Sequence, residues 1–180
     1  MDAFASYLAL IKKVDAFTTA VRAAYPERIA CAPGCDDCCK SAFTLSLVEA
    51  QNLLIGFDAL TPKEKDVAVR SCRNAKSRGP CPLLYGGLCM LYSHRPIICR
   101  THGLPFKSSH LRINGLEVTS FCDMNFAGPG VSALRQEHIL NLDLVNETLS
   151  AINRLFMKEL GLEGGAERVH VTELFVGRTA

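Results

Sequence analysis

Cysteine residues dominate the chemistry that this sequence can support. Eight of the nine cysteines fall into two stretches, Cys31, Cys35, Cys38 and Cys39 in the first and Cys81, Cys89, Cys99 and Cys122 in the second. Short loops between closely spaced cysteines bring their sulfurs within a few ångströms of one another. In a reducing compartment such clusters bind metal more often than they form disulfides, and an odd number of cysteines suits a disulfide framework poorly. The thiols therefore predict metal coordination.

Two kinds of metal centre are compatible with these thiols. Zinc takes four nitrogen or sulfur ligands in a tetrahedron, whereas an iron–sulfur cluster takes one thiolate on each iron. Eight thiols divide into two groups of four, which allows two zinc ions, two clusters, or one of each. Side chains of neighbouring residues on an extended backbone point in opposite directions. We therefore expect Cys38 and Cys39 to serve two separate centres, or two irons of one large cluster.

Three other side chains near Cys99 are candidates for the same centre. His102 lies three residues after Cys99, at C-x2-H spacing, and is a candidate ligand. Four thiolates around a divalent ion leave a net charge of about −2, which a guanidinium offsets while it donates hydrogen bonds to sulfur. Because Arg95 and Arg100 flank Cys99, we expect both to lie beside the centre. The ninth cysteine, Cys72, follows a helical apolar pattern and is expected in the core.

The order of these motifs resembles that of a known family. The string C-x3-C-x2-C-C from Cys31 is followed from Cys81 by C-P-x6-C-x-L-Y-x-x-R-P-x2-C-R. This combination is similar to the CxxCxxCC cysteine-cluster family, the YkgJ-like domains described as zinc- or iron-chelating. The matched motifs cover about residues 31–122, and one branch of the family includes flagellin lysine methylases, which are larger than this chain. The resemblance implies metal binding, and it keeps a cluster-dependent methylase-like transferase as an alternative.

Three classes of function compete: metal handling or electron transfer, enzyme catalysis at the centre, and an interaction module with a structural metal. The spacing Cys31-x3-Cys35-x2-Cys38 matches that of radical S-adenosylmethionine enzymes, but the alternating strands and helices of their partial barrel are missing from the sequence. The chain also lacks a glycine-rich phosphate loop, an H-E-x-x-H motif and a Ser/His/Asp set. We expect a metal-binding protein, with zinc or iron–sulfur in one or two centres.

Composition and charge exclude several other classes. The chain has 180 residues, 48% of them hydrophobic, which suits one domain over residues 1–180 with a core of its own. Its net charge of +2 gives no field that favours nucleic acid. Lys12 and Lys13 interrupt the first apolar stretch, so a secretory signal is not expected, and no uncharged run reaches the ~20 residues of a membrane span. We therefore expect a cytoplasmic protein.

Helices are expected on both sides of the cysteine motifs. Apolar residues at three- and four-residue steps predict an amphipathic helix that ends at Tyr25-Pro26. Its predicted apolar face consists of Phe4, Tyr7, Leu8, Ile11, Val14, Phe17 and Val21. Capping boxes predict one helix from Ser46 to about Gly56 and another from Thr61 to about Arg78. A long helix is predicted over about residues 132–160, with His138 as a core histidine on its apolar face.

Two hairpins are expected between these helices. Gly86-Gly87 predicts a tight turn that places Cys81 and Cys89 on paired strands, and Asn114-Gly115 predicts a second hairpin that brings Cys122 toward the cluster. A helical turn from His94 would hold Cys99, and a last strand is expected within residues 169–175. The predicted fold is α+β and mainly α-helical, with the helices and hairpins around a cysteine-rich metal centre.

Overall fold

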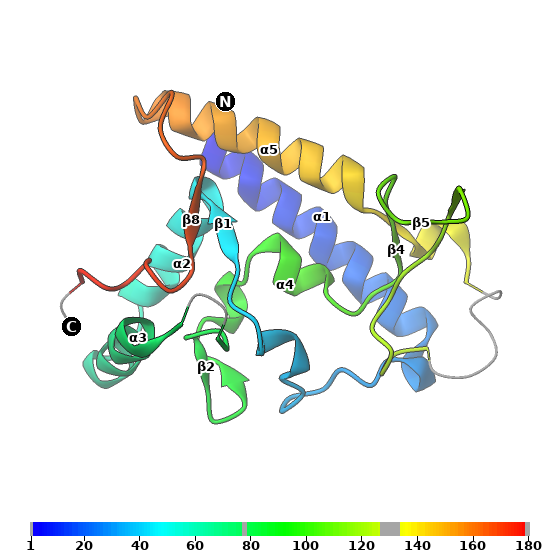
Figure 1. The fold of residues 1–180 in the computed structure, drawn as a ribbon, viewed down its shortest axis with the longest axis horizontal. Helices are drawn as coiled ribbons and strands as arrows, with labels where there is room; N and C mark the ends of the chain where they lie inside the picture. Colours follow the sequence, from blue (N-terminus) through cyan, green and yellow to red (C-terminus); the bar gives the residue numbers. More distant parts are fainter. Residues whose placement is uncertain (1, 77–78, 127–133, 179–180) are drawn as a thin grey trace.

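The computed structural model describes residues 2–76, 79–126 and 134–178. The chain is mainly helical, and its short strands form four two-stranded sheets in the described residues. The α+β, mainly helical fold predicted from the sequence is therefore confirmed. Figure 1 shows two long helices side by side along one edge, with the cysteine-bearing segments below them.

The two long helices are α1 (Ala3–Ala24) and α5 (Leu142–Glu159), and they pack against each other. The Ala3 amide donates to both carboxylate oxygens of Glu159, at 3.1 and 3.2 Å, which ties the start of α1 to the end of α5. The predicted amphipathic helix is confirmed, but Leu8 is 38% exposed. Leu10 is buried instead, because the face that α1 turns toward its neighbours lies to one side of the predicted stripe.

Both predicted capping boxes are present. They begin α2 (Leu47–Asp58), where Ser46 and Glu49 cap each other's backbone, and α3 (Pro62–Asn74), where Thr61 and Glu64 do the same. Such boxes satisfy amide groups that have no partner within the helix. Helix α3 ends at Asn74, earlier than expected, and residues 77–78 of the predicted segment lie outside the described residues.

Strand pairing joins distant parts of the chain. β1 (Thr44–Ser46) is antiparallel to β8 (Arg168–His170), and β4 (Phe106–Lys107) is parallel to β7 (Leu140–Asn141). The last strand thus ends before the predicted segment does.

The two predicted hairpins are also present. The first consists of β2 (Leu84–Tyr85) and β3 (Leu88–Cys89), and the second of β5 (Arg112–Ile113) and β6 (Leu116–Glu117). Cys89 lies on β3 as expected. The strand placement of Cys81 was wrong, because Cys81 lies three residues before β2.

The final helix begins about ten residues later than the sequence suggested. The side chain of Asn141 accepts from the Leu144 amide at 3.1 Å and caps α5, while Asn141 itself belongs to the strand pair with β4. His138 lies before this strand in a 3₁₀ turn (Gln136–His138), where it is buried with Nδ1 3.2 Å from the Tyr25 hydroxyl. The expected core role of His138 is confirmed, although residues 132–133 of the predicted helix lie outside the described residues.

A buried carboxylate connects β1, α2 and the short helix α4 (Ile97–Thr101). Glu49 is 3% exposed, and its Oε2 accepts from the amide and the hydroxyl of Ser46 at 3.0 and 2.8 Å. Its Oε1 accepts from the Ile97 amide at 3.0 Å, so the same side chain caps α4. None of the described helices has the length and apolarity that crossing a membrane requires.

Gly56 of α2 is a sensitive packing position, because a Cβ there would lie 2.6 Å from His94 Cγ and Cδ2. We predict that Gly56→Ala lowers the free energy of unfolding by about 1 to 2 kcal/mol, since overpacking outweighs the better helix propensity of alanine. Chemical denaturation measures this change. In a His94→Ala background the two ring contacts at 2.6 Å are gone and only the His94 Cβ, at 3.0 Å, stays close, so Gly56→Ala should cost less. An equal loss in both backgrounds would contradict this explanation.

Candidate metal centre

Four of the predicted ligands converge on the hydrophobic core, and we call them the core thiol group: Cys39, Cys81, Cys89 and Cys99. They come from a 3₁₀ turn (Asp37–Cys39), the segment before β2, β3 and α4. The Cys81 amide donates to the Cys39 carbonyl at 2.7 Å, which joins the two cysteine arrays. Cys81 is buried in a core cluster, and Cys39 and Cys89 pack against the same cluster. This group is therefore part of the folded interior.

The thiols of this group influence one another electrostatically. Burial, with a smaller contribution from the nearby Cys89 thiol, raises the pKa of Cys81 to about 11. Burial also raises the pKa of Cys99 far above its ordinary value, and the thiols of Cys81, Cys89 and Cys39 add to this shift. Clustered thiols disfavour one another's ionisation because like charges repel. A bound cation reverses this effect, so metal binding must release protons from the group.

The remaining predicted cysteines lie nearer the surface, and we call them the loop thiol group: Cys31, Cys35, Cys38 and Cys122. Burial raises the pKa of Cys35, and the thiols of Cys31 and Cys38 raise it further, which places these three together. Cys38 is exposed, and Cys35 is held by a local turn in which its amide donates to the Ala32 carbonyl at 3.0 Å. This part of the site is supported mainly by local backbone contacts.

A buried amide side chain supports the loop thiol group from below. Asn125 has no exposed surface, and its Nδ2 donates to the Gly103 carbonyl at 2.7 Å and to Cys31 Sγ at 3.4 Å. Its Oδ1 accepts from the Ala30 amide at 2.9 Å. A Cβ on Gly103 would lie 3.3 Å from Cys31 Sγ and 3.5 Å from the Cys122 Cβ, so Cys31 and Cys122 both lie next to this glycine. Sequence reasoning missed Asn125, since a single asparagine after Cys122 carries no recognisable signal.

The two thiol groups adjoin at Cys38 and Cys39. The backbone there is a 3₁₀ turn instead of an extended segment, and the two sulfurs lie 3.9 Å apart. The premise that neighbouring side chains diverge at this point was therefore wrong, because the turn brings both sulfurs to one side. This spacing leaves the two thiols at the boundary between two centres or within one larger centre.

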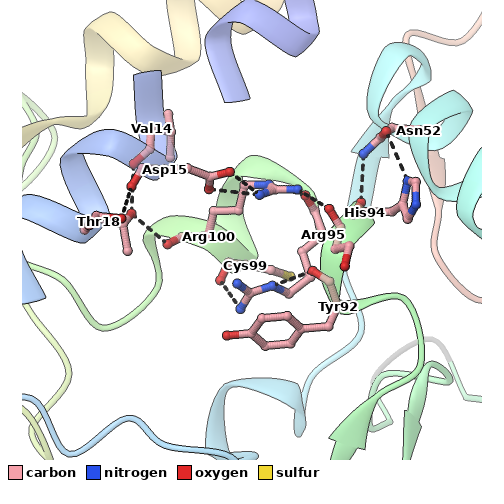
Figure 2. A network of polar contacts seen from close by, with 11 residues as sticks. Val14, Asp15, Thr18, Asn52, Tyr92, His94, Arg95, Cys99 and Arg100 are labelled. Carbon is pink, nitrogen blue, oxygen red and sulfur yellow. Dashed lines mark hydrogen bonds and ion pairs between the residues drawn. The ribbon is translucent and has the colours of Figure 1, made fainter. Parts of the chain in front are cut away.

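Arg95 lies beside the core thiol group. Its Nη1 is 3.5 Å from the Cys99 carbonyl, its Nε donates to the Tyr92 carbonyl at 3.0 Å, and its guanidinium lies 3.5 Å from the centre of the Tyr92 ring. Figure 2 shows this guanidinium between the ring and the Cys99 segment. Its charge acts to lower the pKa values of Cys89 and Cys99, although burial dominates both. Arg95 can therefore offset negative charge on thiolates.

Arg100 points away from the sulfurs, toward α1 (Figure 2). Its Nη1 lies 2.9 and 2.7 Å from the two carboxylate oxygens of Asp15, while Nε and Nη2 donate to the carbonyls of Arg95 and Ser93, each at 2.7 Å. Arg100 is buried, so this arrangement fixes α4 and the segment before it against α1. The described contacts give Arg100 a role in holding Cys99 in place, not in contacting sulfur.

His102 and Cys122 line a cavity of about 770 Å³ on the side of the loop thiol group. His102 is exposed at the end of α4. Cys72, by contrast, is 3% exposed in the core, with its sulfur 3.8 Å from the Val171 carbonyl. The structure therefore places Cys72 as the sequence predicted.

All nine cysteines are free thiols, and they form neighbouring groups instead of a finished coordination shell. Among the described residues, no three His, Cys, Asp or Glu side chains already surround one point at metal-ligand distance. The donor set nevertheless fits zinc or iron, because soft thiolates are preferred ligands of both zinc and iron–sulfur centres. Metal binding would require the thiols to lose protons and draw together.

The helical frame and the clustered thiols define a class of small cysteine-cluster domains. A family model described as "Putative zinc- or iron-chelating domain" matches residues 30–122, more than half of the chain. The chain belongs to this family, the CxxCxxCC domains. No curated protein and no solved structure matches the chain. The family supports metal binding in general.

Asn125 provides a test of how the loop thiol group is held. We predict that Asn125→Ala lowers the free energy of unfolding by about 1 to 3 kcal/mol, because it removes the hydrogen bonds that the buried Asn125 side chain makes to the Ala30 amide and the Gly103 carbonyl. It should also reduce the metal bound by the loop thiol group. Denaturation and elemental analysis measure the two effects. Asn146→Ala, at an exposed position on α5, is the control and should change neither, whereas an equal effect of both variants would refute the role of Asn125.

Proposed function

We propose that this chain is a metal-handling protein that binds metal in two thiolate centres. The core thiol group would supply four ligands to one centre, and the loop thiol group would supply four to the other. Cys31, Cys35 and Cys38 form the near side of the second centre, with Cys122 as the fourth ligand and His102 as its alternative. Two observations support this proposal: the Cys81–Cys39 backbone bond joins the two arrays, and the sulfurs of Cys38 and Cys39 lie 3.9 Å apart where the two groups adjoin.

The different surroundings of the two groups support different duties. The core thiol group packs against apolar residues and is joined by the Cys81–Cys39 backbone bond, so its metal would contribute to folding stability. The loop thiol group includes the exposed Cys38 and adjoins the cavity, so its metal would exchange more readily. We infer a stable structural metal in the first group and a mobile cargo in the second.

The same donors suit two kinds of metal centre. Eight thiolates can close two zinc centres, or they can hold iron–sulfur clusters that would serve electron transfer. We place the protein in the cytoplasm, because nine free thiols suit a reducing compartment. Anaerobic purification followed by elemental analysis and a visible spectrum separates the two metals: broad sulfur-to-iron absorption indicates clusters, and a colourless protein with two zinc ions indicates closed zinc centres.

Ligand membership gives the decisive test. Cys99→Ser should remove the core metal and lower the melting temperature strongly, whereas Cys35→Ser should remove the loop metal and lower it less. Cys72→Ser is the matched control; it should keep both metals and cost only ~1 to 2 kcal/mol for a buried hydroxyl. Elemental analysis and thermal denaturation measure the outcomes.

If either ligand variant lost both metals, the eight thiols would form one shared centre and not two separate centres. Equal metal loss in Cys72→Ser would contradict the assignment of ligands. A metal content that no cysteine variant changes would overturn the proposed function.

A further inference from the structure

The cavity beside the loop thiol group points to a second binding site. We propose that this cavity binds a low-molecular-weight thiol with an apolar body, which exchanges metal with Cys122. This inference rests on the proposed function, since it names the carrier from which the loop thiol group receives metal or to which it delivers it.

The size and walls of the cavity suit a small organic molecule. Its volume of about 770 Å³ lies within the range of small-ligand sites, which are mostly apolar with a few convergent polar groups. Side chains from α4, β4, β7, α5 and the segment before Cys122 form the apolar walls: Ile97, Ile98, Phe106, Phe121, Leu140, Leu142 and Leu149. An apolar body gains free energy by leaving water for such walls.

The polar groups at the β1–β8 end of the cavity already have partners. Asn153 accepts from the Val48 amide at 3.1 Å and donates to the Glu167 carbonyl at 3.1 Å. Arg168 donates to the hydroxyl and the carbonyl of Thr44, at 2.9 and 2.6 Å. Because these groups already form hydrogen bonds within the protein, they keep this end of the cavity in shape. A ligand therefore does not need polar groups at this end.

The chemistry of the opposite end selects a thiol. Cys122 lines the cavity, and both Cys122 and Cys31 lie next to Gly103, so one residue of the loop thiol group is also part of the cavity wall. His102, the other candidate for the fourth ligand position, lines the cavity as well. A metal held by soft thiolates is transferred most readily to an equally soft donor. A ligand that carries a thiol at this end can therefore compete with Cys122 for the metal.

The exchange is balanced without any oxidant. The incoming thiol forms one metal–sulfur bond, and the bond between the metal and Cys122 breaks. The proton of the incoming thiol passes to the released Cys122 thiolate, directly or through the His102 imidazole. No electron is transferred. The metal keeps its bonds to Cys31, Cys35 and Cys38 until the same exchange is repeated at each of them, and the reverse series of exchanges loads the loop thiol group from a metal-bearing thiol.

Cobalt provides a direct readout of this exchange. The full chain is loaded anaerobically with Co²⁺, its metal content is measured, and it is then titrated with phenylpropanethiol while sulfur-to-cobalt absorption is recorded. Phenylpropanol is the matched probe without sulfur, and mercaptoethanol is the thiol without an apolar body. We expect phenylpropanethiol to change the absorption and to accelerate cobalt transfer to a chelator. Mercaptoethanol should need about tenfold higher concentration, and phenylpropanol should compete without changing the absorption.

Filling the cavity tests its location. Asn146 lines the cavity from an exposed position on α5, and in the described part of the chain its side chain makes no hydrogen bond. Asn146→Trp should weaken phenylpropanethiol binding about tenfold. Glu147→Trp, at the next exposed position outside the cavity, should leave it unchanged. Ser150→Phe fills the cavity from the same helix and provides a second variant if the first does not fold.

Two results would overturn the inference. One is equal potency of mercaptoethanol and phenylpropanethiol, which would mean simple ligand competition without a binding site. The other is unchanged affinity in folded Asn146→Trp and Ser150→Phe variants, which would place the probe elsewhere. Failure of the proposed function would show earlier and separately, as a chain that does not take up two cobalt ions before any thiol is added.

Discussion

The Glu49 carboxylate is the interaction on which the arrangement of the site depends. It completes the capping box at the start of α2 through Ser46 and also accepts the first amide of α4 at Ile97. A carboxyl group at 3% exposure is tolerated only because these donors replace the water it has lost. One buried side chain thus fixes the distance between the first cysteine array, which precedes β1, and Cys99 on α4. It acts together with the Cys81–Cys39 backbone bond, which joins the two arrays directly.

The two thiol groups depend on this frame to different degrees. The core thiol group shares its packing with α2, α3 and β8, and Arg100 adds a buried link from α4 to Asp15 on α1. The loop thiol group depends on local turns and on the side chain of Asn125. Local opening generally costs less where few buried contacts must break. We therefore expect the segment that holds Cys38 to open more easily than the nearby segment that holds Cys81.

Local rules predicted much of the fold. The predictions of capping boxes at Ser46 and Thr61 and of a turn at Asn114 are correct. In each case the sequence signal and the structure it produces lie within a few residues of one another. The start of α5 was misplaced, since the pairing of β7 with the distant β4 overrides helical periodicity there. Likewise, nothing near Asn125 reveals its contact with Cys31. Spacing identified which cysteines are neighbours, but long-range packing decides how they are grouped.

The pairing of β1 with β8 has a consequence for the order of events during synthesis. Thr44 emerges from the ribosome soon after the first cysteine array, but its partner His170 is made more than a hundred residues later. All eight clustered thiols, up to Cys122, are therefore synthesised before the strand that pairs with β1 exists. Contacts so distant in sequence form slowly. A metal ion that binds early would protect the nascent chain from oxidation and give its last segment a surface on which to fold.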